Sequence, residues 1–115
     1  MHRLAIALLS LLLVVEAAQG AARKGTRFWN LTSSTVTRLQ LAPAGTQSFG
    51  ADQCQNDPDG AVDHDERLRL VGVAPGRYDV KLADKTGRVC VVRNLAIEDD
   101  KVFSITEADL TDCGH

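Results

Sequence analysis

Apolar and polar side chains alternate along most of this chain after its first 22 residues, and this two-residue period constrains the fold more than any other feature. The clearest stretch, Arg77–Leu82, places Tyr78, Val80 and Leu82 on one side and charged residues on the other. Residues that alternate in this way point to opposite faces of a β-strand, whereas a helix needs a period near 3.6 residues, which is not sustained before the C-terminus. The pattern predicts an all-β protein.

Short strands separated by turn residues are expected throughout residues 26–112. The expected strands are Thr26–Leu31, Thr35–Ala42, Arg67–Leu70, Arg77–Leu82, Arg88–Arg93 with a short continuation at Ala96 or Ile97, and Lys101–Thr106. One helical turn capped by Thr106 is expected at residues 107–110. Six or seven strands at this spacing are typical of an antiparallel sandwich or a small barrel. We predict a single domain, residues 26–112, folded as a small antiparallel β-sandwich.

The expected core follows from the same alternation. Its members are Phe28 or Trp29, with Leu39, Leu41, Leu68, Leu70, Tyr78, Val80, Leu82, Val89, Val91, Leu95, Phe103 and Ile105. Phe28 and Trp29 are neighbours in one strand and point to opposite faces, so only one of them can enter the core. An outward Trp29 is either a contact residue for a partner or glycan, or is covered by the N-terminal segment.

The first 22 residues have the pattern of a secretory signal peptide. Arg3 supplies positive charge, and the apolar run Leu4–Val15 is too short to cross a membrane, which needs about 20 residues. Small residues such as Gly20 and Ala22 then fit the cleavage site of a signal peptidase. We predict that residues 1–22 are removed and that the protein is secreted or periplasmic, with no stable membrane insertion afterwards. The alternative is a short membrane anchor.

All three cysteines, Cys54, Cys90 and Cys113, follow the predicted cleavage site. An oxidising compartment lets two of them pair, which leaves one thiol over. The sequence does not rank the three pairings. The remaining cysteine is either a reactive or intermolecular thiol, or a buried residue that acts as a small apolar side chain.

Residues 52–66 carry six acidic side chains and no lysine or arginine. Aligned with the twelve-residue calcium loop of helix–loop–helix proteins, Gln55–Glu66 places four carboxylates at ligand positions, those of Asp57, Asp59, Asp63 and Glu66. Gln55 stands where an aspartate is usual, and the flanking residues do not predict helices. The hypotheses are a calcium site and a solvated acidic connection between strands.

Charge and motif content exclude several classes of function. The net charge of −2 leaves no basic surplus, so nucleic acid is not expected as a partner. His64 lies in the acidic loop and His115 is the last residue, and neither belongs to a nucleophile, phosphate-binding or zinc-peptidase motif. We expect no catalytic residue, no cofactor other than calcium, and no enzymatic activity.

Loose motifs between Phe28 and Ile105 resemble a family of small exported bacterial β-sandwich proteins that has no assigned activity. The matching residues are Asn30-Leu31-Thr32, Val36 with Leu39 and Leu41, Pro43, Phe49-Gly50-Ala51-Asp52, Gly76-Arg77-Tyr78-Asp79-Val80 and Gly87-Arg88. Residues 54–65 have the appearance of an insertion. A second resemblance, over Val73–Val80, is to prealbumin-like and carboxypeptidase regulatory-like modules. Both resemblances imply a β-sandwich, and neither implies catalytic residues.

The sequence therefore predicts an exported β-sandwich that acts as a binding or structural module without catalytic activity. Its expected partner is a protein or a glycan of unknown identity. The alternative is an extracytoplasmic protein that calcium stabilises through the acidic loop at residues 55–66.

Overall fold

The computed structural model describes residues 23–115, and the predicted signal peptide, residues 1–22, lies outside them. Within residues 23–115 the chain forms seven strands and two short 3-10 helices. In chain order they are β1 (Arg27–Leu31), β2 (Val36–Pro43), η2 (Gln53–Asn56), β3 (Arg67–Arg69), β4 (Gly76–Asp84), β5 (Val89–Ile97), β6 (Val102–Thr106), η3 (Glu107–Asp109) and β7 (Cys113–Gly114). No helix of this described range is long and apolar enough to cross a membrane.

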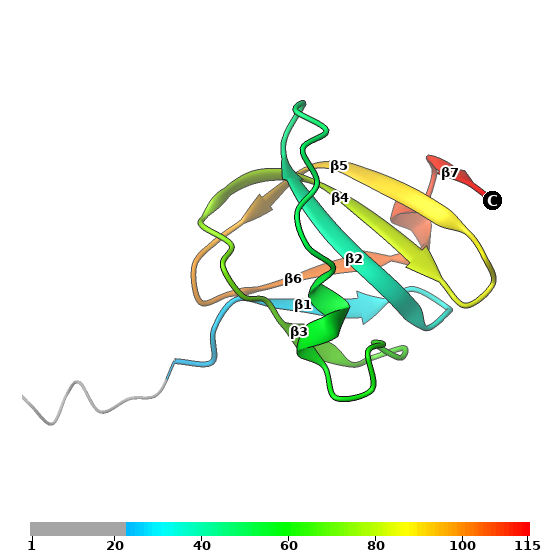
Figure 1. Cartoon of the computed structure of the whole chain (residues 1–115), viewed down its shortest axis with the longest axis horizontal. Coiled ribbons are helices and arrows are strands. Elements are labelled where there is room, and N and C mark those ends of the chain that lie inside the picture. The colour runs from blue at the N-terminus through cyan, green and yellow to red at the C-terminus, as the bar shows by residue number, and fades with distance from the viewer. Residues whose placement is uncertain (1–22) are drawn as a thin grey trace, which may run out of the picture.

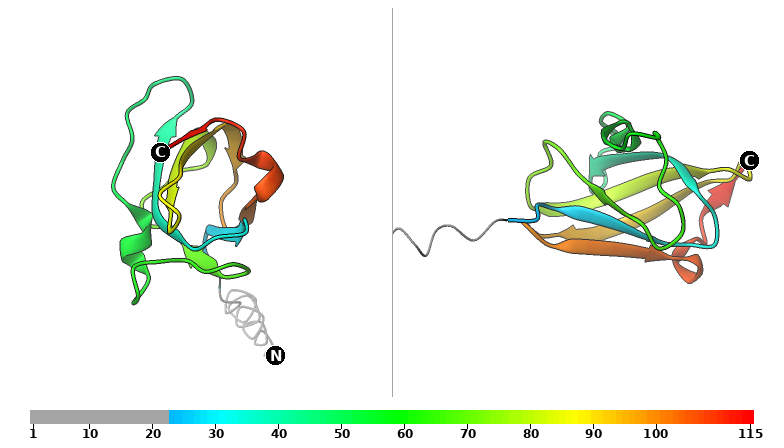
Figure 2. Two further views of the ribbon diagram at one scale, coloured as in Figure 1. Left: turned by 90° about the vertical axis from the view of Figure 1, so that its right-hand side faces the viewer. Right: turned by 90° about the horizontal axis from the view of Figure 1, so that it is seen from below.

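The strands form two packed sheets, with strand orders β3-β1-β6 and β2-β4-β5-β7. Figure 1 shows the first sheet below the second, and Figure 2 views the two layers from other sides. The predicted β-sandwich is confirmed. One strand pair departs from the antiparallel expectation, because β1 and β6 run parallel, with Arg27 opposite Val102. The turn after β5 carries the chain to the other sheet, and β6 therefore starts at the same end as β1.

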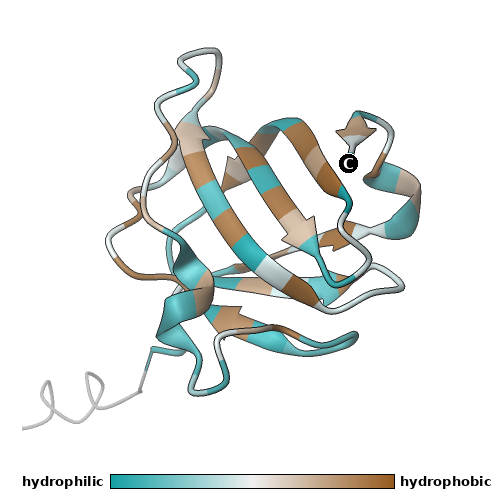
Figure 3. Cartoon of the chain, turned by 45° about the vertical axis from the view of Figure 1, so that its right-hand side comes forward, coloured by the Kyte–Doolittle hydropathy of each residue, from teal (hydrophilic) through white to brown (hydrophobic). Residues whose placement is uncertain are grey.

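The core lies between the sheets and follows the alternation of the sequence. Phe28, Leu39, Leu82 and Ile105 are fully buried, and the Phe28 ring lies 5.5 Å from that of Phe103. Figure 3 shows the apolar and polar bands alternating along the strands. Because Phe28 points inward, the neighbouring Trp29 points outward, as strand geometry requires.

The predicted orientation of the first half of β5 is wrong. Val89 is 40% exposed, whereas Cys90 is fully buried. The reason is the register with β4, in which Cys90 lies opposite the inward-facing Leu82. Directly opposed residues share a face of a sheet, so Cys90 is inside and its neighbours point outward. A β-bulge in the pairing of β4 with β5 then shifts the inward–outward alternation of β5 by one residue, so that the odd-numbered Ile97 faces the core.

The long connection between β2 and β3 covers the outer edges of both strands. Val62 exchanges two backbone hydrogen bonds of 2.9 Å with Val36, and the Asp52 carboxylate accepts from the backbone N–H of Leu39 at 2.9 Å. On β3, the Asn56 side chain donates to the carbonyl of Arg69 at 3.1 Å. These contacts close one seam of the sandwich, and they bury Val62, which the sequence pattern did not place in the core.

Asn30, in β1, is a fully buried polar residue with every hydrogen-bonding group engaged. Its side-chain nitrogen donates to the carbonyls of Ser34 and Val62, and its side-chain oxygen accepts from the N–H and hydroxyl of Thr32. The side chain therefore ties the β1–β2 turn to the long connection. Within the Asn30-Leu31-Thr32 triplet, Asn30 and Thr32 therefore hold the β1–β2 turn in place.

A disulfide joins Cys90 of β5 to Cys113 of β7, which leaves Cys54 as the free thiol. Cys54 is the buried residue of η2, which agrees with the interpretation of the third cysteine as a small apolar side chain. Burial, together with the nearby Asp52 carboxylate, raises the pKa of the Cys54 thiol to about 12. The thiol therefore stays protonated at neutral pH.

Candidate functional site

Three of the four carboxylates of the calcium hypothesis, those of Asp57, Asp63 and Glu66, accept hydrogen bonds from the protein itself. Asp57 accepts from the backbone N–H of Asp59 at 2.8 Å, Asp63 accepts from the Thr35 hydroxyl at 2.8 Å, and Glu66 accepts from the backbone N–H of Asp63 at 2.7 Å. The bonds of Asp57 and Glu66 are local ones, in which a side chain takes the place of a backbone acceptor, and the bond of Asp63 joins the loop to Thr35, immediately before β2.

The surroundings of this loop are not those of a helix–loop–helix site. A single 3-10 turn, η2, precedes the loop, and strand β3 follows it. Val62 pairs with β2 in the middle of the loop. Within residues 23–115, no three His, Cys, Asp or Glu side chains lie together as a group that could hold a metal ion. The calcium site stays a prediction.

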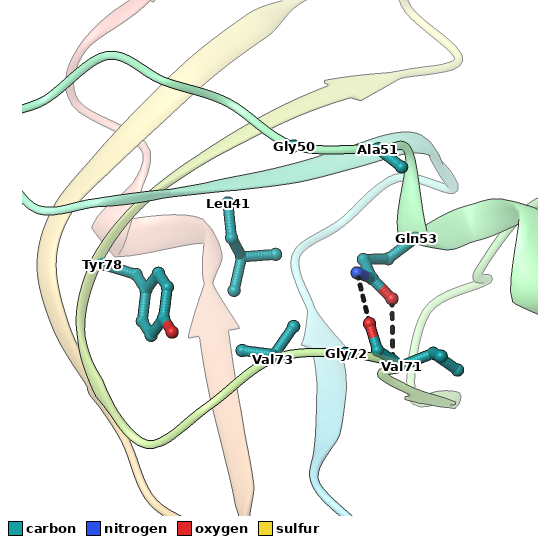
Figure 4. A pocket seen from close by; sticks show the side chains of 8 residues that line it. All are labelled: Leu41, Gly50, Ala51, Gln53, Val71, Gly72, Val73 and Tyr78. Carbon is teal, nitrogen blue, oxygen red and sulfur yellow. Dashed lines mark hydrogen bonds between the residues drawn. The ribbon is translucent and has the colours of Figure 1, made fainter.

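A small pocket of about 250 Å³ opens where the long connection passes the β3–β4 loop (Figure 4). Its lining residues are Leu41, Gly50, Ala51, Gln53, Val71, Gly72, Val73 and Tyr78. The amide of Gln53 forms two hydrogen bonds with the backbone of Val71, and the Tyr78 hydroxyl donates to the Ala74 carbonyl at 2.6 Å. The polar side chains of the lining are thus engaged with the protein itself.

The outward face of the β3-β1-β6 sheet has a different chemistry. We call it the Arg–Trp face, and it consists of Arg27, Trp29 and Leu31 of β1, Arg67 and Arg69 of β3, and Val102 and Ser104 of β6. The ladder register places Arg69 opposite Arg27, and Arg67 opposite Trp29. Since opposed residues share a face and Phe28 points inward, these side chains all point to solvent. The face combines three cationic side chains, one indole and two aliphatic residues.

Trp29 and Arg67 form the centre of the Arg–Trp face. The guanidinium carbon of Arg67 lies 4.0 Å from the centroid of the indole ring, which is the geometry of a cation–π contact. The indole N–H donates to the Asp65 carboxylate at 2.9 Å. The half-buried Trp29 is therefore covered by Arg67 of the adjacent strand and oriented by Asp65. Neither of these residues belongs to the N-terminal segment.

Arg27 and Arg69 lie close together at one end of the same face. The Arg27 Nε donates to the carbonyl of Gly25 at 3.1 Å. Arg69 packs over the same residue, so closely that a Cβ at Gly25 would lie 2.7 Å from the Arg69 Nε. In the described range, the ion pairs involve Arg23, Arg88 and Arg93, and none involves an arginine of the Arg–Trp face.

The sequence indicated the members of this face but not their assembly. Alternation placed either Phe28 or Trp29 outside, and the Arg67–Leu70 pattern placed both arginines in water. What the sequence did not show is that β3 pairs with β1 in the register that brings Arg67 onto Trp29. The two residues are far apart in the chain, and no local pattern encodes the pairing of distant strands.

The Arg–Trp face, the pocket and the acidic loop are three features of the described surface with a chemistry of their own. The family resemblance over residues 28–105 stays a prediction. Comparison of the chain with family models, with curated proteins and with solved structures gives no match.

Proposed function

We propose that this protein is exported and serves outside the cytoplasm as a non-catalytic binding module, with the Arg–Trp face as its ligand-contact surface. One observation carries the proposal: Arg67 is stacked on Trp29 at the centre of an outward sheet face, with two more arginines beside it. Arginine and tryptophan are the residue types most enriched where proteins make energetically important contacts.

Two features support export. The first 22 residues have the composition of a signal peptide. The Cys90–Cys113 disulfide is typical of proteins that fold in an oxidising compartment.

The chemistry of the face supports binding. Guanidinium groups keep their charge at all physiological pH values, so they hold a ligand by charge and hydrogen bonds and do not transfer protons in the way a general acid or base must. The indole N–H is already donated to Asp65. These properties favour contact with a ligand, and not proton transfer, as the role of the Arg–Trp face.

Trp29 provides the test, because it is the single tryptophan of the chain and its fluorescence reports on this face. The full-length gene is expressed, and the protein is recovered from the extracytoplasmic fraction and analysed by mass spectrometry for loss of residues 1–22. The product is then titrated with a panel of soluble polysaccharides, peptides and lipid vesicles. We expect at least one member to change the Trp29 emission saturably, with tenfold weaker binding for Arg67→Ala.

The matched control is Arg38→Ala, which removes one positive charge from an exposed position of β2 in the other sheet. It leaves the affinity unchanged if the Arg–Trp face is the binding surface. Equal losses for Arg67→Ala and Arg38→Ala would mean that only net charge matters, and the proposed surface would be wrong. An unprocessed protein retained in the cytoplasm would contradict the export.

A further inference from the structure

We infer that the ligand of the Arg–Trp face is an acidic polysaccharide, a chain of sugar units that carry carboxylates. The inference rests on the proposed function and names the chemical class of its ligand.

The arginines of the face form no ion pair among the described residues. Arg27 and Arg69 are directly opposed across β1 and β3, and like charges in such a pair repel and destabilise a sheet. Two carboxylates border the face, because Asp65 accepts from the Trp29 indole N–H and Asp100 accepts from the backbone N–H of Gly25, and the three arginines outnumber them. An anion placed between the two arginines removes their repulsion, which makes a negatively charged ligand the complement of this face.

The orientation of Arg67 favours carboxylates as the anionic groups. A guanidinium stacked on an aromatic ring keeps its N–H donors in the plane of the stack, and they point sideways to solvent. A planar carboxylate accepts two parallel hydrogen bonds from such a fork. Because the indole already fixes the Arg67 side chain, less conformational entropy is lost when the ligand binds.

The shape of the face favours an extended sugar chain. The pocket described above is lined by residues outside the Arg–Trp face, so we expect a ligand of the face to lie across its strands. Successive outward residues of a strand are about 7 Å apart, and neighbouring strands are about 5 Å apart, so the three arginines offer several anion positions in a flat array. Leu31 and Val102 border the array and give apolar contact for the C–H faces of sugar rings.

The same geometry makes a peptide ligand a poorer complement. Peptides that add to a sheet do so along a strand edge, where unpaired backbone N–H and C=O groups are available. An outward sheet face presents side chains only. Binding to this face therefore depends on side-chain charge and on the regular spacing of anions along the ligand.

The probe for the test is polygalacturonate, with its methyl-esterified form as the matched control, because esterification removes the charge and keeps the sugar backbone. Affinity is measured by Trp29 fluorescence and by calorimetry on the processed, exported protein. We expect saturable binding of polygalacturonate, at least tenfold weaker binding of the ester, and weaker binding at 1 M salt, where charges are screened beyond about 3 Å.

Three variants of the face and one control variant locate the site. Arg27→Gln and Arg69→Gln are each expected to weaken binding about tenfold, whereas Arg38→Gln on the other sheet leaves it unchanged. Arg67→Lys keeps the charge and loses the planar fork, so we expect it to weaken binding as well. Circular dichroism and thermal melting check that each variant is folded. If a variant does not fold, the comparison of polygalacturonate with its ester still tests the inference, because it uses the unsubstituted protein.

Two further probes, polyglutamate and vesicles that contain phosphatidylglycerol, separate this inference from the proposed function. If either binds as tightly as polygalacturonate with the same dependence on Arg27 and Arg69, the face binds anions and the proposed function stands, but the assignment to sugars is overturned. If polygalacturonate and its ester bind alike, or if neither binds, the inference is also overturned. The proposed function is then tested separately, by the binding of the panel of polysaccharides, peptides and vesicles to the unsubstituted protein and to Arg67→Ala.

Discussion

Two buried or half-buried carboxylates, those of Asp52 and Asp79, satisfy backbone amides that lie outside the regular ladders. Asp52 accepts from the N–H groups of Leu39 and Cys54, and Asp79 accepts from those of Gly45 and Asn94. Burial by itself would raise the pKa of Asp52, but these hydrogen bonds outweigh it and hold the pKa below its usual value. Both aspartates belong to motifs seen in the sequence, where nothing indicated that they act as acceptors for distant segments.

Removal of the Asp52 carboxylate tests this role. Asp52→Ala leaves two N–H groups without their acceptor, and we expect the free energy of unfolding to fall by about 2 kcal/mol. Asp52→Asn keeps one oxygen acceptor, so the loss is expected to be smaller. Urea unfolding followed by circular dichroism measures both, and an equal loss for the two variants would contradict the assigned role.

The buried thiol of Cys54 allows a second prediction at this scale. With its pKa raised to about 12 by burial, almost no thiolate forms at pH 8, and thiolate is the form that reacts. Iodoacetamide is expected to leave the native protein unmodified and to add one carbamidomethyl group per chain in urea, as read by mass spectrometry. Modification of the native protein at the same rate as the unfolded one would show that Cys54 is accessible.

At the scale of strands, local patterns identified most elements, and tertiary contacts decided the rest. The alternation at residues 77–82 lies within β4, and β6 starts one residue later than expected. The failure at β5 has a physical cause: Val89 and Cys90 are both apolar, so the register with Leu82, which is not local, decided which one is buried. The parallel pairing of β1 with β6 could not be predicted either, because the two-residue alternation of apolar and polar side chains does not specify the order of strands in a sheet.

The short strand β7 pairs with β5 and is joined to it by the disulfide. Cys90 and Cys113 are 23 residues apart in sequence, and a bridge that closes a loop of this size adds about 3 kcal/mol in the chain-entropy description. The variant C90A/C113A is expected to lose about that much stability in urea unfolding, while C54A keeps the bridge and serves as the control for a lost cysteine. An unchanged unfolding midpoint for C90A/C113A would show that the bridge does not stabilise the fold.

Helix η3 is attached to the rest of the sandwich by an ion cluster. Arg88 binds Glu107 at 2.7 Å and Asp84 at 3.0 Å, and Glu107 also accepts from the N–H and hydroxyl of Ser33. The Arg88 guanidinium, together with Ser33, lowers the pKa of Glu107 from 4.5 to about 2. Asp109 of the same helix accepts from the backbone N–H of Thr106, so the expected helical turn after β6 is present.

A lowered pKa makes the Glu107 contribution depend on pH in a defined direction. The carboxylate stabilises the folded state fully above pH 4.5, and this stabilisation is lost as the pH falls from 4.5 to about 2. Glu107→Gln is expected to cost about 1 kcal/mol or less at pH 7, because the pair is partly exposed, and to flatten the stability profile in this window. Urea unfolding at a series of pH values, with Glu98→Gln as the exposed control, measures the difference.

For the molecule as a whole, alternation was enough to predict two stacked sheets, and the candidate face required the assembled fold. Arg67 was expected in water, and either Phe28 or Trp29 was expected outside the core. The contact of Arg67 with Trp29 exists only because the long connection returns the chain to β1. The same connection was seen in the sequence as an acidic segment, but its function in covering the edges of β2 and β3 depends on packing that charge content does not encode.

Melting of the whole protein tests the calcium hypothesis. A ligand at 100 times its dissociation constant adds about 2.7 kcal/mol, which raises the melting temperature of a domain of this size by several degrees. Because Asp57, Asp63 and Glu66 already accept bonds from the protein, we expect the same melting temperature in calcium and in chelator. A rise that Asp63→Asn abolishes would establish the site.

The buried network of Asn30 has a practical consequence for anyone producing this protein in yeast or mammalian cells. Its Asn30-Leu31-Thr32 triplet matches the acceptor that oligosaccharyltransferase modifies, yet the folded state leaves no room for an oligosaccharide on that nitrogen. Attachment during translocation would trap the chain before β1 could close on its neighbours. Production in a bacterial host that lacks this enzyme avoids the glycosylated, misfolded product.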